Sequence, residues 1–192
     1  MLNVKVIVGS TRPGRFSEKV LPWLKAELVK DDQFNVEVLD LLDYPMPYFD
    51  FPMSPAYIQN GEYPSEAVRA WAKKIDEADA YIMIAPEYNH GYSAVLKNAL
   101  DVVYSEWNNK AVGFISYGSV GGGRVVEQLR QVAVELQMAS TRAAVHIQAP
   151  WLLSNEDGSL KDAALDPYHH SLVDMLAQLK WWGTALQTAR TK

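Results

Sequence analysis

Cysteine is absent from the 192 residues of this chain. Its absence excludes a disulfide framework, a metal site built from thiolates and a cysteine nucleophile. We therefore expect any redox chemistry of the chain to belong to a bound cofactor, because no side chain can supply a dithiol couple.

Excess basic charge and long hydrophobic runs are also missing. The formal net charge is -5, whereas a nucleic-acid-binding protein needs a basic face that exchanges for the counterions of phosphate. No apolar run approaches the ~18 residues of a membrane span, and the N-terminus lacks the basic and apolar regions of a signal peptide. We therefore expect a soluble cytoplasmic protein whose partners are neither nucleic acid nor membrane.

The length and the hydrophobic pattern predict a single α/β domain that spans residues 1–192. A chain of this size commonly folds around one core, and 48% of its residues are hydrophobic. Short β-branched runs alternate with longer segments of helical period, which is typical of parallel sheets. The predicted strands are residues 4–8, 34–39, 81–85, 112–117 and 143–147, and the predicted helices lie near residues 16–28, 65–78, 96–103, 125–136 and 166–188, with Ser65 as a cap of the second.

The character of the strands predicts their order. Residues 81–85 are apolar throughout, as a strand covered on both faces should be, whereas residues 34–39 alternate with polar side chains and indicate an edge. A five-stranded parallel sheet with this edge fits a flavodoxin-like three-layer sandwich of order 2-1-3-4-5. Ligands of such sheets bind at the carboxyl ends of the strands beside the switch point, here the ends of the first and third strands.

The segment at residues 41–64 resists this regularity, since it is rich in aromatic side chains and contains five prolines. Long irregular loops in compact domains are uncommon and often functional. Because it follows the second strand, we expect it to overhang the site, with Tyr48, Tyr57 and Tyr63 near the rim. The alternative is a proline-stiffened connection whose aromatic rings pack on the body of the domain.

The sequence G-S-T-R-P-G-R-F-S leaves the first strand and precedes a helix. It supplies hydroxyl groups at Ser10, Thr11 and Ser17 and guanidinium groups at Arg12 and Arg15. The amides and the positive end of a helix N-terminus favour an anion, and hydroxyl and arginine donors complete a phosphate cradle. We interpret this loop as the site of a terminal phosphate monoester; a capped turn with two solvated arginines is the alternative.

Two better-known nucleotide motifs are incomplete in this loop. Arg15 and Phe16 stand where a triphosphate loop has the lysine and the hydroxyl that reach the outer phosphates and Mg²⁺. The dinucleotide fingerprint G-x-G-x-x-G is absent, because Gly9 and Gly14 are too far apart. Asp40, after the edge strand, is weak support for either motif. We therefore expect neither a P-loop nucleotidase nor a dinucleotide fold.

The sequence P-E-Y-N-H-G-Y-S leaves the third strand. Pro86 cannot extend the ladder, and Ser93 can cap the next helix. The turn residues between them should leave the amides of residues 87–91 exposed, while the tyrosines offer flat surfaces to a planar heteroaromatic ring. A tight turn with packed tyrosines is the alternative. His90 receives no catalytic role, because a lone loop histidine is more often a surface residue.

The sequence I-S-Y-G-S-V-G-G-G-R ends the fourth strand and opens a helix. Its glycines permit positive φ angles and a close approach of backbone to ligand, and Ser116 and Ser119 offer hydroxyl groups. A glycine-rich connection alone is weak support for a site. As the third loop at the same edge of the sheet, it predicts another wall of one crevice.

Together, G-S-T-R-P-G-R-F-S, P-E-Y-N-H-G and S-Y-G-S-V-G-G-G-R resemble the signature loops of the NADPH-dependent FMN reductase family, which includes quinone, azo-dye and chromate reductases. The resemblance implies FMN as cofactor, NADPH or NADH as reductant and a homodimer or homotetramer. It places the FMN phosphate at the first loop and the isoalloxazine ring between the other two. The cofactor-binding residues that follow are Ser10, Thr11, Arg12, Arg15, Ser17, Pro86, Glu87, Tyr88, Asn89, Gly91, Ser116, Tyr117, Gly118 and Ser119.

By this resemblance the chain is an oxidoreductase that passes hydride from NAD(P)H to FMN and electrons on to a quinone, an azo compound, free flavin or a metal oxyanion. The protein orients and tunes the cofactor, so that no catalytic side chain and no metal site are expected. A flavodoxin-like electron carrier and an FMN-binding regulatory module are the alternatives. A hydrolase is disfavoured, because the G-x-S-x-G elbow is absent.

Overall fold

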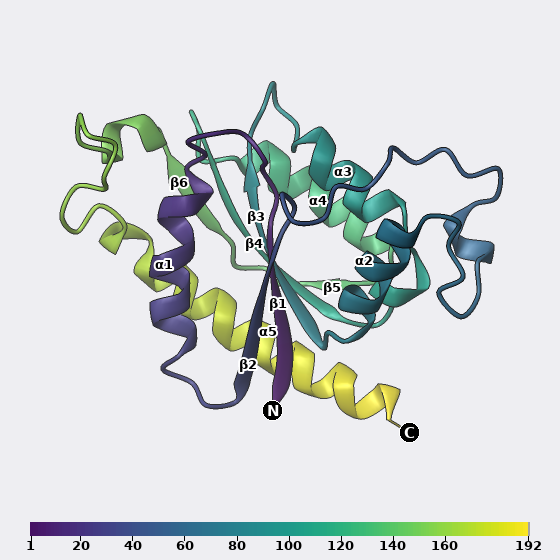
Figure 1. Cartoon of the computed structure of the whole chain (residues 1–192). Coiled ribbons are helices and arrows are strands. Elements are labelled where there is room, and N and C mark those ends of the chain that lie inside the picture. The colour runs from purple at the N-terminus through teal and green to yellow at the C-terminus, as the bar shows by residue number, and fades with distance from the viewer. Residues whose placement is uncertain (192) are drawn as a thin grey trace.

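The computed structural model describes residues 1–191 and shows a parallel sheet covered by helices on both faces (Figure 1). Lys192, the last residue of the predicted domain, lies outside the described residues. The sheet runs in the order β2-β1-β3-β4-β5, and β6 pairs with β4, so the predicted flavodoxin-like order is confirmed. The strands are β1 (Leu2–Val8), β2 (Phe34–Asp40), β3 (Ala80–Pro86), β4 (Ala111–Gly118), β5 (Ala139–Ser140) and β6 (Val145–Gln148).

The predicted fifth strand, residues 143–147, corresponds to β6, and the additional short strand β5 is the main difference from the expected sheet. β5 pairs with the start of β4 at Ala111, and β6 pairs with its end, from Ile115 onward. Between them the chain leaves the sheet at Thr141, whose hydroxyl donates to the carbonyl of Ala143 at 2.8 Å. β5 has only two residues, too few to show a period of two in the sequence.

Two apolar clusters separate the helices onto the two faces of the sheet. Alternate side chains of β1, such as Val6 and Ile7, point into opposite clusters, as the pleat requires. One cluster contains residues of α1 and α5, and the other contains residues of α2, α3 and α4. The helices are α1 (Ser17–Leu28), α2 (Glu66–Asp76), α3 (Ala94–Asp101), α4 (Gly123–Glu135) and α5 (His169–Arg190).

The edge assignment of β2 is confirmed, since this strand pairs with β1 and is only partly buried, whereas every residue of β3 is buried. The predicted cap of α2 is wrong in one respect. Ser65 occupies the N-cap position, but its side chain makes no capping hydrogen bond. Ser93 does cap α3, because its hydroxyl accepts the amide of Leu96 at 3.2 Å.

The segment at residues 41–64 packs against α2 and α3, and the expectation that it overhangs the site is wrong. The ring of Tyr44 meets the ring of Trp71 at 5.2 Å between centroids, and Tyr63 is 1% exposed with its hydroxyl donating to Glu106 at 2.7 Å. Burial of these rings outweighs any gain from covering the crevice. None of residues 41–64 lines the cavity described below, Tyr48 and Tyr57 included.

In the part of the chain that the structure describes, no helix combines the length and the apolar character that crossing a membrane requires.

Candidate functional site

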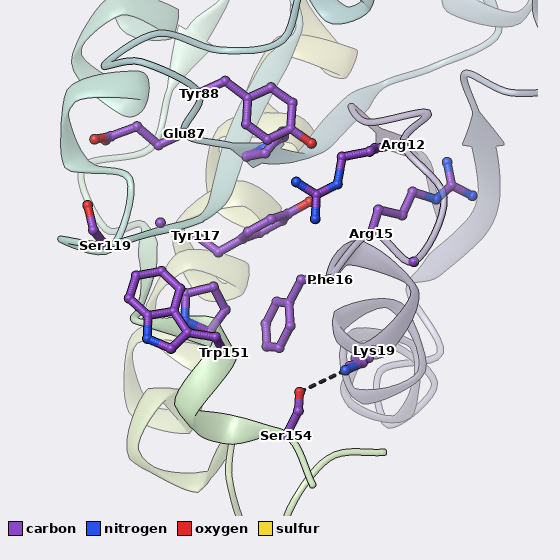
Figure 2. A pocket seen from close by; sticks show the side chains of 14 residues that line it. Arg12, Arg15, Phe16, Lys19, Glu87, Tyr88, Tyr117, Ser119, Trp151 and Ser154 are labelled. Carbon is purple, nitrogen blue, oxygen red and sulfur yellow. Dashed lines mark hydrogen bonds between the residues drawn. The ribbon is translucent and has the colours of Figure 1, made fainter. Parts of the chain in front are cut away.

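A cavity of about 440 Å³ opens at the carboxyl ends of the strands, at the edge of the sheet where the sequence predicts a ligand site (Figure 2). Four connections form its walls: those that follow β1, β3, β4 and β6. The volume lies in the range of small-molecule and cofactor sites. The lining residues are Arg12, Gly14, Arg15, Phe16, Lys19, Pro86, Glu87, Tyr88, Tyr117, Gly118, Ser119, Pro150, Trp151 and Ser154.

The first loop begins with a close approach between two strand ends. The amide of Gly9 donates to the carbonyl of Ile84 at 2.9 Å. A Cβ atom at Gly9 would lie 2.8 Å from that carbonyl oxygen, so the approach needs glycine. This contact places the first loop directly beside the loop that follows β3, and it allows the hydroxyl groups of Ser10 and Tyr88 to meet at 2.9 Å.

Two buried hydroxyl groups beside the N-terminus of α1 have no partner among the described residues. The Ser17 hydroxyl, on a fully buried residue, and the Tyr117 hydroxyl make no hydrogen bond. Burial is the main cause that raises the pKa of Tyr117. Buried polar groups are normally satisfied. Unsatisfied donors at the positive end of a 12-residue helix therefore fit an anion such as the phosphate of FMN.

The two arginines of the first loop have different surroundings. Arg12 is exposed, makes no ion pair within residues 1–191, and extends into the cavity on the side of Tyr117 in Figure 2. Arg15 is 6% exposed and points away toward the end of β2, where its guanidinium forms a two-pronged ion pair with Asp40. Arg15 also donates to Glu18 at 3.1 Å and to the carbonyl of Ser10.

Arg15 and Arg12 therefore have different roles in the first loop. The contact with Asp40 raises the pKa of Arg15 and compensates its charge. The bond from Arg15 to the Ser10 carbonyl fixes the shape of the loop from behind. Arg12 keeps its charge without a carboxylate partner in the described chain, so it is the arginine of this loop that is available to an anion in the cavity.

Replacing Asp40 with asparagine should lower the free energy of unfolding by about 1–3 kcal/mol, because the buried Arg15 loses the less exposed of its two carboxylate partners. Asp40 is itself partly exposed, which places the loss below that of a fully buried pair. The urea midpoint measures the change, provided that the slope stays constant. Asp43→Asn, at an exposed position three residues later, is the matched control. Equal midpoints for the two variants would contradict the structural role of the Arg15–Asp40 pair.

The second loop is a tight turn rather than a row of exposed amides. Tyr88 and Gly91 exchange backbone hydrogen bonds of 2.8 and 3.0 Å, and the two residues between them, Asn89 and His90, have positive φ angles, as in the turns of β-hairpins. The amide of Glu87 donates to the carbonyl of Tyr117 at 2.8 Å. The expectation that the amides of residues 87–91 are exposed is therefore wrong for three of them. Asn89 and Gly91 do not line the cavity, whereas Glu87 and Tyr88 do.

The third loop lies against the second. A Cβ atom at Gly118 would come within 2.8 Å of the Cβ atom of Glu87, so only glycine permits this approach. The Ser116 hydroxyl donates to the carbonyl of Gly121 at 2.8 Å and holds the turn rather than lining the cavity. One carboxylate oxygen of Glu87 pairs with Arg124, while the other is buried without a partner among the described residues. Glu87, in the second loop, therefore keeps one carboxylate oxygen without a partner.

Of the predicted site residues, the cavity brings together Arg12, Arg15, Pro86, Glu87, Tyr88, Tyr117, Gly118 and Ser119. The remaining six do not line the cavity: Ser10, Thr11, Ser17, Asn89, Gly91 and Ser116. Sequence reasoning missed the wall made by Phe16, Lys19, Pro150, Trp151 and Ser154. One available signal was that Pro150 and Trp151 follow the end of a strand, as the three recognised loops do.

Comparison with known proteins shows which protein family this chain is similar to. The family model described as NADPH-dependent FMN reductase matches residues 2–151. An NAD(P)H-dependent FMN reductase of Schizosaccharomyces pombe is 39% identical over 136 residues, which cover 71% of this chain and 68% of that protein. A quinone reductase of Pseudomonas putida is 29% identical over 183 residues, which cover 91% of this chain and 92% of that protein.

Among solved structures, the flavoenzyme FerB of Paracoccus denitrificans, an NAD(P)H:(acceptor) oxidoreductase, has a similar fold. It superposes with a TM-score of 0.72 over 96% of this chain and 98% of that chain, at 22% identity. At this identity the likeness shows the shared fold, including the sheet that presents the cavity.

Proposed function

The chain belongs to the NADPH-dependent FMN reductase family, and we propose that the cavity of Figure 2 is the place where it holds FMN and reduces a second substrate. Membership makes the chain an oxidoreductase with FMN and NAD(P)H as cofactors. The proposal adds which residues bind the cofactor and which acceptors are reduced: a quinone, an azo compound, free flavin or a metal oxyanion.

The observation that carries the proposal is the set of unsatisfied donors at the N-terminus of α1. Ser17 and Tyr117 supply buried hydroxyl groups without partners in the described chain, and Arg12, which lines the cavity together with Tyr117, supplies an uncompensated charge. Ser10, 1% exposed, contacts the hydroxyl of Tyr88, another residue of the cavity lining. A phosphate monoester satisfies such a set without a metal ion, since arginine and hydroxyl donors take the place of the lysine and Mg²⁺ of a triphosphate site.

The second and third loops suit a flat heteroaromatic ring. Tyr88 and Tyr117 line the cavity with their rings, and the free carboxylate oxygen of Glu87 can accept a ring N–H. Gly118 lets the two loops close against each other. These residues bind and orient the ring, and no side chain is required to move a proton.

When bound, FMN accepts a hydride and releases electrons to an acceptor, a chemistry that belongs to the cofactor. The protein restricts the acceptor weakly, because aromatic walls offer few directional contacts to a flat molecule. A quinone is favoured by the name of the Pseudomonas putida relative, a quinone reductase. The cytoplasmic location and the homodimer or homotetramer stay predictions.

The test is to purify the protein and record its visible spectrum. NADPH and NADH oxidation are then followed with a benzoquinone acceptor. We expect a bound or readily acquired FMN and steady-state oxidation that needs both flavin and quinone. A protein that cannot take up FMN would refute the proposal. Bound FMN without turnover would instead indicate an electron carrier or a regulatory module.

A further inference from the structure

One half of the cavity consists of residues to which the FMN site assigns no role. It is formed by Phe16 and Lys19 in the first turns of α1 and by Pro150, Trp151 and Ser154 after β6. In Figure 2 the side chains of Phe16, Lys19, Trp151 and Ser154 lie below that of Tyr117, whereas Glu87 lies above it. We call them the α1–β6 half of the cavity.

Lys19 gives this half a positive charge. Its ammonium group donates to the hydroxyl of Ser154 at 2.7 Å and lies 5.8 Å from the centroid of the Phe16 ring. A hydroxyl and an aromatic ring orient an ammonium group without neutralising it. Within residues 1–191 no carboxylate lies within ion-pair distance of Lys19. The α1–β6 half therefore presents a positioned cation to whatever enters it.

Trp151 gives the same half an unused aromatic surface. Its side chain is 62% exposed although it lines the cavity, whereas Phe16 is packed against Tyr117 at 5.4 Å between ring centroids. A large apolar side chain left exposed in the lining of a cavity favours a ligand that covers it.

The backbone that carries Trp151 is strained. Ala149, directly before Pro150, has φ 44° and ψ 58°, the left-handed conformation that costs an alanine about 1 kcal/mol. Its amide donates to the carbonyl of Gly118 at 2.9 Å, which ties this bend to the third loop. Strain of this kind persists where the surrounding structure enforces it, and it clusters at ligand sites. Here it turns Pro150 and Trp151 toward the cavity.

The wall extends past the residues that the family model matches. The family model ends at residue 151, and Ser154, which positions Lys19, lies beyond it. A flavin monophosphate needs one cation cradle, which Arg12 and its neighbouring hydroxyl groups supply. A second cation with an aromatic surface in the same cavity therefore suits a second ligand.

We propose that the α1–β6 half binds an aromatic ring that carries an anionic group, with the ring against Trp151 and the anion at Lys19. This inference rests on the proposed function, since it assigns the second ligand of the same cavity. Two ligands have this chemistry: the adenosine 2′-phosphate end of NADPH, and an aromatic acceptor that bears a sulfonate or carboxylate.

The experiment uses protein saturated with FMN and measures binding by calorimetry with two probes, adenosine 2′-phosphate and naphthalene-2-sulfonate. Lys19→Gln should lower the affinity of the probe that occupies the site by about fivefold to tenfold. This is the loss expected for one partly exposed charge-assisted hydrogen bond. Lys25→Gln, an exposed lysine on the same helix but outside the cavity lining, is the matched control and should leave binding unchanged.

Steady-state kinetics then shows whether NADPH or an anionic aromatic acceptor is the ligand that occupies the site. If the dinucleotide occupies the site, Lys19→Gln should raise the KM for NADPH but not for NADH. If an acceptor occupies it, the KM should rise for a sulfonated naphthoquinone but not for the unsubstituted one. In either case kcat should stay constant, because Lys19 does not touch the reacting atoms.

Trp151→Ala tests the aromatic surface independently. It should lower the affinity of the same probe. The control is Trp181→Ala, which removes a tryptophan of similar exposure on α5 and should leave that affinity unchanged. Failure of both probes to bind the parent protein, or equal binding by the Lys19 and Lys25 variants, would overturn the inference. So would a loss of FMN affinity in Lys19→Gln, which would place Lys19 in the cofactor cradle. Failure of the parent protein to bind FMN would refute the proposed function instead.

Discussion

Arg12→Ala should weaken the binding of FMN by about 10- to 150-fold. The guanidinium of Arg12 is the uncompensated cation of the first loop, and a hydrogen bond to a charged group contributes about 1.5–3 kcal/mol. Riboflavin, which lacks the phosphate, should bind the variant and the parent protein equally. Quenching of flavin fluorescence in a titration measures both affinities.

The control for this prediction is Arg142→Ala, which removes the same charge from an exposed position outside the cavity lining. It separates a contact with phosphate from a general loss of positive charge, because the net charge of the two variants is the same. An unchanged FMN affinity in Arg12→Ala would remove Arg12 from the cradle. An equal loss in both variants would reduce its role to long-range electrostatics.

Gly122→Ala should lower the free energy of unfolding by about 2–4 kcal/mol. Gly122 has φ +73°, which an alanine adopts only with strain, and a Cβ atom there would lie 2.7 Å from the Cβ atom of Ser116. Ser116 belongs to β4 and is fully buried, so it cannot move aside cheaply. The turn that opens α4 has to distort instead, and urea unfolding measures the cost.

Gly61→Ala separates the two parts of that cost. Gly61 has φ +67° with nothing within 4 Å of the added Cβ atom, so the substitution carries backbone strain alone and should lose about 1 kcal/mol. The excess loss in Gly122→Ala is then the steric clash between the third loop and β4. An equal loss of unfolding free energy in the two variants would show that the third loop shifts to accommodate the added Cβ atom and is not a rigid wall of the cavity.

The sequence predicted much of the fold, because the hydrophobic pattern of each strand and the residues of each turn depend on short stretches of chain. β3 is apolar from end to end and β2 alternates, and these two facts give the edge and the strand order. Three strand ends carry glycine, proline and hydroxyl residues directly before helices, so the sheet order alone brings those loops to one edge. The additional strand β5 could not be predicted, since two residues at Ala139 show no period.

The parts of the site that sequence reasoning missed depend on long-range contacts. Arg12 and Arg15 are equivalent in the sequence, and only the end of the neighbouring strand, with Asp40, decides which guanidinium is held away from the cavity. Ser154 reaches Lys19 across a separation of 135 residues. In the segment at residues 41–64, the ring of Tyr44 packs against Trp71 of α2, and no pattern within that segment could indicate this contact.

Affinity for FMN compared with riboflavin tests the phosphate cradle most directly. The two ligands share the same ring and differ in the phosphate, so their ratio isolates the contribution of Arg12, Ser17 and the N-terminus of α1. We expect FMN to bind at least about 100-fold more tightly, as two or more charge-assisted hydrogen bonds require. Equal affinities would contradict the assignment of this loop to a phosphate monoester.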